Sequence, residues 1–98
     1  MSTEKDLTKP NWALLDYNFI GDGVDVLTFG AKKYGIKDWM NMNDATEVYF
    51  AALMRHLVAW RNGEVADKDT GKSHLAHAFC NLMFLNHFDK ENNNNGRS

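Results

Sequence analysis

The residues best suited to chemistry lie in one stretch of the chain, between residues 55 and 81. Glu64 and Asp67 supply carboxylates, and His74 and His77 follow shortly after. His74, His77 and Asn81 are spaced i, i+3 and i+7, which places them on one face of a helix. Carboxylates and imidazoles brought together bind divalent metals: oxygen ligands suit Mg²⁺, whereas Mn²⁺ and Zn²⁺ accept imidazole better. The stretch therefore predicts a metal site, with solvated loop acids and helix-start histidines as the alternative.

His56 and Trp60 lie just upstream, on the apolar side of a predicted helix. A histidine on such a stripe is more often a hydrogen-bonded core residue than a ligand. We therefore interpret His56 as a core histidine and Trp60 as a core aromatic residue.

A second cluster contains Lys32, Lys33 and Tyr34, with Trp39 a few residues later. Lysines at the end of a helix interact favourably with its negative dipole end, which explains the pair without a function. The functional alternative is that a lysine binds a phosphate while Tyr34 or Trp39 stacks on a base.

Three segments with helical spacing must position these residues, and no segment alternates like a strand, so we predict an all-α fold. Asp44 with Glu47 three residues later indicates a capping box. The third segment has Ser73 or Thr70 as its N-cap. The segments run from about Gly21 to Lys33, from Asp44 to Asn62, and from just after Ser73 to about Phe88. The expected architecture is a small antiparallel helical bundle of about three main helices.

The 98 residues and formal charge of -2 describe one small domain. We expect a flexible segment over residues 1–11, one helical domain over 12–89, and a disordered polar tail over 90–98. So small a chain buries only about 60–65% of its unfolded surface, so we expect a homo-oligomer, a dimer or tetramer. The near-neutral charge argues against a nucleic-acid binder acting through bulk charge.

The remaining composition points to a cytoplasmic protein. Cys80 is the single cysteine, so no internal disulfide can form, and we interpret it as a buried small apolar residue. No apolar run approaches the length that crosses a bilayer, and the first residues do not form a signal peptide.

Several separate motifs carry a resemblance to a known family. They are Phe29-Gly-Ala-Lys-Lys-Tyr-Gly35 with Trp39, Arg55-His56-Leu57, Ala59-Trp60, Gly63-Glu64-x-x-Asp67, Gly71, Ser73-His-Leu-Ala-His77, Asn81 and Leu85. In this order they resemble the phage dATP/dGTP diphosphohydrolase domain, a helical family related to MazG-like nucleotide pyrophosphohydrolases. The similarity covers residues 12–88.

The resemblance implies hydrolysis of purine deoxynucleoside triphosphates to monophosphate and pyrophosphate with Mg²⁺ or Mn²⁺, in the host cytoplasm if the protein is viral. Carried over, Glu64 and Asp67 are catalytic acids on the metal side. The other implied roles are metal or phosphate contact for His74 and His77, charge balance for Arg55, phosphate binding for Lys32 or Lys33, base contact for Tyr34 or Trp39, and pocket lining for Asn81.

The chain departs from the MazG pattern because it has no E-E-x-x-E helix. Asp22 and Asp25 share a helical face and are either a substitute for it or solvated helix-start acids. Two alternatives to the enzyme therefore stay open: a catalytically inactive protein that binds or sequesters nucleotides, and a small helical protein-interaction module.

Overall fold

The fold is all-helical, as predicted. The structure is a computed structural model that describes residues 7–94, with side chains described through residue 92. In chain order it contains the short 3-10 helix η2 (Trp12–Leu14), α1 (Tyr17–Tyr34), the short 3-10 helix η3 (Asp38–Asn41), α2 (Ala45–Arg61) and α3 (His74–Asn94). Within residues 7–94, the only β-type pairing is one isolated β-bridge between Ala66 and Ser73.

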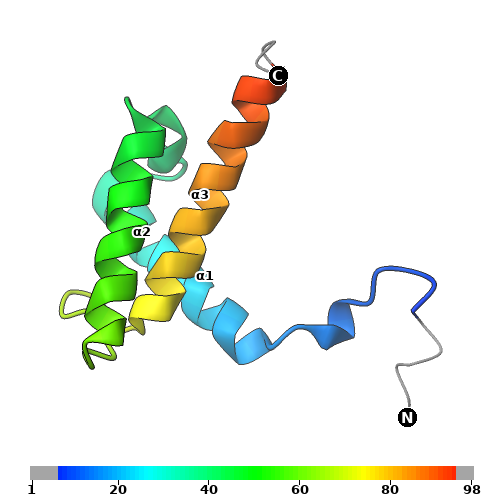
Figure 1. The fold of residues 1–98 in the computed structure, drawn as a ribbon, viewed down its shortest axis with the longest axis horizontal. Helices are drawn as coiled ribbons and strands as arrows, with labels where there is room; N and C mark the ends of the chain where they lie inside the picture. Colours follow the sequence, from blue (N-terminus) through cyan, green and yellow to red (C-terminus); the bar gives the residue numbers. More distant parts are fainter. Residues whose placement is uncertain (1–6, 95–98) are drawn as a thin grey trace.

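Helices α2 and α3 form an antiparallel hairpin, and α1 crosses α3 (Figure 1). The loop that joins α2 to α3 lies at the lower end of the hairpin in this view, and residues 7–16 extend away from the helices. The C-terminal half of α2 is thereby placed beside the N-terminal half of α3. No helix within residues 7–94 is long and apolar enough to span a membrane.

Most of the buried residues lie on α2 and α3, and the Sγ of Cys80 donates to the Gly23 carbonyl of α1. The buried apolar side chains are Ala45, Tyr49 and Leu53 on α2 and Ala76, Ala78 and Cys80 on α3. Small residues on α3 let the two helices approach closely. Farther along the hairpin, Trp39 of η3 stacks on Phe84 with ring centroids 4.6 Å apart, and the Tyr49 hydroxyl donates to the Trp39 carbonyl at 2.8 Å. Trp60, predicted to be core, is instead 42% exposed.

Helix α1 starts one turn before the predicted Gly21. Asp16 is its N-cap, and the Asp16 Oδ1 accepts hydrogen bonds from the backbone N–H groups of Asn18 and Phe19 at 3.1 and 3.4 Å. This cap satisfies two amides that a helix start leaves unpaired. Gly21 and Gly23 consequently lie inside the helix.

Helix α2 has the predicted boundaries but not the predicted capping box. Asp44 adopts a left-handed conformation with φ 53 and makes no side-chain cap hydrogen bond. The helix ends before Gly63, whose φ of 96 favours glycine. The apolar spacing was therefore sufficient to define this helix without the cap.

Helix α3 starts where predicted, because the Ser73 Oγ accepts a hydrogen bond from the Leu75 N–H at 3.0 Å. It continues to Asn94, beyond the predicted end near Phe88. An i,i+4 pair between His87 and Glu91, 3.2 Å apart, supports the added turn. Residues 95–98 of the predicted tail and residues 1–6 of the predicted N-terminal segment lie outside the described residues.

Candidate functional site

The loop between α2 and α3 is built around Asp67. Its Oδ2 accepts hydrogen bonds from the backbone N–H groups of Asp69 and Thr70 at 3.0 and 3.2 Å. Its own N–H donates to the Lys72 carbonyl, and the Gly71 N–H donates to its carbonyl, each at 2.8 Å. Gly71 has a φ of 71, in the left-handed region, where a residue with a side chain would be strained. The turn thus fixes the Asp67 carboxylate near the start of α3.

Asp67 remains a carboxylate at neutral pH. Burial raises its pKa, but the amide hydrogen bonds from Thr70 and Asp69 and the neighbouring His77 outweigh that effect and hold the pKa of Asp67 below its usual value. A half-buried negative charge is therefore available at this end of the hairpin.

His77 faces the same loop from α3. Its Nε2 lies 2.7 Å from the Thr70 Oγ1 and 3.8 Å from the Asp67 Oδ2. Burial lowers the pKa of His77 more than the Asp67 charge raises it. The ring is consequently neutral at pH 7, and its Nε2 is occupied by the threonine hydroxyl.

His74, at the first position of α3, is buried with 5% of its surface exposed. Its Nδ1 lies 2.9 Å from the Nδ1 of His56. Its Nε2 lies 3.4 Å from the Glu64 Oε1, within ion-pair distance, yet the alignment is not that of a hydrogen bond, so this buried nitrogen has no hydrogen-bond partner. The structure therefore places the Glu64 carboxylate next to the His74 imidazole.

His56 is the residue that sequence reasoning assigned to the core, and the structure places it in the centre of this group. Its ring stacks on His77 with centroids 4.4 Å apart and planes 13° apart. Burial lowers the pKa of His56 to about 4, with His77 and His74 adding to the effect. A signal was present in the sequence: an antiparallel hairpin brings the apolar stripe of α2 to face the histidines of α3.

A cavity of about 870 Å³ opens beside this group. Its polar wall comes from the C-terminal half of α2, the loop and α3, and its opposite wall comes from the end of α1 and η3. Of the predicted site residues, Lys33, Tyr34, Trp39, Arg55, Asp67 and His77 line it, together with His56. A volume of this size is typical of small-molecule sites.

The other predicted site residues lie outside the cavity wall. Lys32 is exposed at the end of α1. Asn81 is buried, and its Nδ2 donates to the His77 carbonyl at 2.9 Å, one helical turn away.

The two aromatic residues predicted to contact a base line the cavity but differ in their surroundings. The Trp39 ring stacks on Phe84. Tyr34 is 64% exposed, and the Lys33 ammonium lies 5.3 Å from its ring centroid.

The two acids of α1 are bound elsewhere. The Lys72 ammonium lies 2.9 Å from an Asp25 carboxylate oxygen and 3.8 Å from one of Asp22. These partly exposed ion pairs connect α1 to the loop. Asp22 and Asp25 thus share a face, as predicted, and the single charge of Lys72 balances one of their two negative charges.

The fold and the site define a small all-helical domain with a carboxylate–imidazole group at the closed end of a helical hairpin. The chain belongs to the family described as dATP/dGTP diphosphohydrolase, N-terminal, whose model matches residues 2–97. A protein named dATP/dGTP diphosphohydrolase from Salmonella phage PMBT28 is 32% identical over 80 residues, which cover 82% of this chain and 27% of that protein. The chain thus spans about a quarter of its relative's length. No solved structure matches it.

Proposed function

We propose that the chain hydrolyses purine deoxynucleoside triphosphates, dATP and dGTP, to the monophosphate and pyrophosphate. In this reaction water adds to the α-phosphorus, the bond from that phosphorus to the bridging oxygen breaks, and pyrophosphate leaves. The substrate class comes from the name of the phage relative and of the family. The reaction requires positive charge for the triphosphate and a base for the water.

The cavity is the observation that carries the proposal, because its wall combines positively charged groups for the phosphates with an aromatic ring for the base. Arg55 and Lys33 on its wall supply positive charge for phosphate oxygens. Asp67 and His77 lie on the same wall. At the α1 end, exposed Tyr34 offers an aromatic ring to a base. Trp39 also lines the cavity, whereas Lys32 and Asn81 lie outside its wall.

The carboxylate–imidazole group fits a divalent cation, for which the family resemblance suggests Mg²⁺ or Mn²⁺. The fit rests on the buried Nε2 of His74, which has no hydrogen-bond partner, and on carboxylates from Glu64 and Asp67 nearby. Such a cation neutralises triphosphate charge and makes a water more acidic. The candidates to hold it are Glu64, Asp67, His74 and His77.

The proposal is tested by incubating the chain with each deoxy- and ribonucleoside triphosphate in Mg²⁺ or Mn²⁺ and measuring monophosphate and pyrophosphate together. We expect turnover of dATP and dGTP. Asp67→Asn keeps the amide hydrogen bonds of the loop but removes the charge, and we expect it to lower kcat by at least about 100-fold.

Asp44→Asn is the matched control, because Asp44 is exposed at the start of α2 and makes no side-chain cap hydrogen bond. It should keep full activity. Absence of turnover with every triphosphate, or equal loss in both variants, would contradict the proposal.

One observation favours a second function, a nucleotide-binding protein that does not hydrolyse its ligand. Asp22 and Asp25, the acids of α1, both pair with Lys72, whereas Asp67 and Glu64 pair with His77 and His74. Because few carboxylates are free to hold a metal, the chain would bind the phosphates of a nucleotide without hydrolysing it. Calorimetry would then show saturable binding of dATP or dGTP with the ligand recovered intact.

A further inference from the structure

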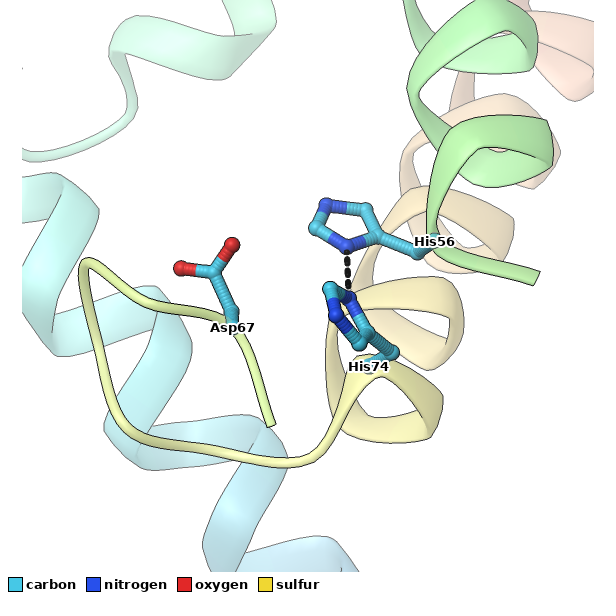
Figure 2. A group of neighbouring side chains, drawn as sticks. All are labelled: His56, Asp67 and His74. Carbon is cyan, nitrogen blue, oxygen red and sulfur yellow. Dashed lines mark hydrogen bonds between the residues drawn. The ribbon is translucent and has the colours of Figure 1, made fainter. Parts of the chain in front are cut away.

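The ligand atoms that lie closest together are not those that the sequence grouped. His56 of α2, Asp67 of the loop and His74 of α3 each offer one atom, and these atoms lie within 4.8 Å of one another. Figure 2 shows the two imidazoles meeting from different helices, with the Asp67 carboxylate across from them on the loop. Three protein segments therefore converge on one point.

The spacing within the group is that of ligands around one ion. Atoms bound to a metal at about 2.0–2.2 Å are separated by roughly 3–4 Å when they subtend angles between 90° and 180°. The Nδ1 atoms of His56 and His74 are 2.9 Å apart, and the remaining separations stay within 4.8 Å. The ligand atoms are thus close to the spacing around one ion, and movements of about 1 Å would complete the coordination.

The buried nitrogen of His74 provides an independent indication. A buried polar atom without a hydrogen-bond partner destabilises the fold, so packing alone does not explain this histidine. A histidine that binds a metal through one ring nitrogen usually donates the other N–H to a carboxylate. The Glu64 Oε1, 3.4 Å from the His74 Nε2, is placed to accept that N–H once the ring is oriented by a metal.

We propose that His56, Asp67 and His74 form a three-ligand site for a first-row transition-metal dication, and that this site excludes Mg²⁺. Glu64 is a positioning residue that orients His74. His77 stacks on His56 and pairs with Thr70, outside the ligand set. Two imidazoles and one carboxylate match the His₂-carboxylate sets that bind zinc with one position open, whereas Mg²⁺ prefers oxygen ligands.

This inference deepens the proposed function by choosing its cation, and its test does not depend on turnover. The chain is stripped with a chelator and titrated with Zn²⁺ by calorimetry, and with Co²⁺ by visible absorption. We expect one ion per chain, tetrahedral Co²⁺ bands, and no displacement by a large excess of Mg²⁺. Failure to bind either ion, or displacement of Co²⁺ by Mg²⁺, overturns the proposal.

Variants identify the ligands. His56→Gln and Asp67→Asn should each abolish the Co²⁺ bands, and Glu64→Gln should weaken affinity by about 10- to 100-fold. His87→Gln is the matched control, because His87 lies on α3 far along the helix and pairs with Glu91. Asp67 lies in a loop, so its variant remains informative if His56→Gln does not fold by circular dichroism.

The outcomes separate this inference from the proposed function. Binding that needs His56 and Asp67, without hydrolysis of any triphosphate, supports the metal site and contradicts the enzyme. Hydrolysis that proceeds with Mg²⁺ in His56→Gln contradicts the metal site and supports the enzyme. Equal loss of binding in His87→Gln, or loss in His77→Gln with full binding in His56→Gln, also overturns the proposed ligand set.

Discussion

The Nδ1 atoms of His56 and His74 lie 2.9 Å apart, although the residues belong to different helices. Two protonated imidazoles cannot share this contact, because one ring must accept through a lone pair while the other donates. His77 stacks on the far side of His56, 4.4 Å away. Burial lowers the pKa of both His56 and His77, so these two rings are neutral near pH 7.

This arrangement makes the metal-free fold sensitive to mild acid. The pKa of His56 is about 4 in the folded chain against 6.5 as its ordinary value, and that of His77 is also lowered. Between these values the unfolded chain binds more protons, so folding stability falls as the pH decreases from 6.5 towards 4. After allowance for the partial exposure of His56, we expect a loss of about 1–2 kcal/mol.

The measurement is a series of thermal melts in chelator between neutral pH and pH 4, where Tm should fall by at least about 4 °C. His56→Gln should flatten this dependence, and His87→Gln should retain it. Asp67, whose pKa is lowered from 3.8, contributes to a separate loss below that pH. A Tm that is constant across the range would show that the pKa of His56 is not lowered in the folded chain.

The helices could be predicted from the sequence because their signals are local. Apolar spacing gave α2 its boundaries, and Ser73 marked the start of α3. The start of α1 was misplaced because Gly21 and Gly23 were interpreted as a weak helix start. Helix propensities of residues differ by only about 0.1–1 kcal/mol, and the contact between Gly23 and α3 outweighs this difference.

Part of the site could be predicted and part could not. Asp67, His74 and His77 are close in the chain, and the sequence predicted that they could meet if the second and third helical segments formed a hairpin. The place of His56 depended on the register of α2 against α3, which is a tertiary arrangement and cannot be read from the sequence of either helix alone. Without that register, a histidine on an apolar stripe is indistinguishable from a core residue.

Gly23 is required where α1 crosses α3. A Cβ at this position would lie 2.8 and 2.9 Å from Cδ2 and Cε2 of Phe79, whose ring is held edge-on by Phe19 at 5.2 Å. Overpacking of this kind costs about 1–3 kcal/mol, which exceeds the gain in helix propensity of up to about 1 kcal/mol. We expect Gly23→Ala to destabilise the chain by about 1–2 kcal/mol in urea denaturation.

Gly21→Ala is the matched variant, because nothing lies within 4 Å of a Cβ at Gly21. It should stabilise the same helix by about 0.5–1 kcal/mol. If both substitutions stabilised the chain equally, the contact between Gly23 and Phe79 would not be a constraint.

Cys80 is protected at the same crossing. Its side chain is buried, its Sγ donates to the Gly23 carbonyl at 3.3 Å, and burial raises the pKa of the thiol to about 11. A rise from 9.0 to about 11 lowers the thiolate fraction near neutral pH by about 100-fold. We expect iodoacetamide to alkylate the native chain at least about 100-fold more slowly than the denatured chain. Similar rates in the two states would show that α1 opens freely from α3.

The outer face of α2 makes the predicted homo-oligomer testable. Phe50, Met54 and Val58 follow one another at i, i+4 and i+8 and are 52%, 40% and 53% exposed, which forms an apolar stripe away from α3. Burial of such a stripe against a second copy would offset the small core of the single chain.

We expect light scattering at tens of micromolar to give a dimer or larger, and Met54→Lys to give a monomer. Val48→Lys, on a different face of the same helix and 39% exposed, should leave the mass unchanged. A monomeric wild-type chain, or equal dissociation by both lysines, would rule out this stripe as the contact.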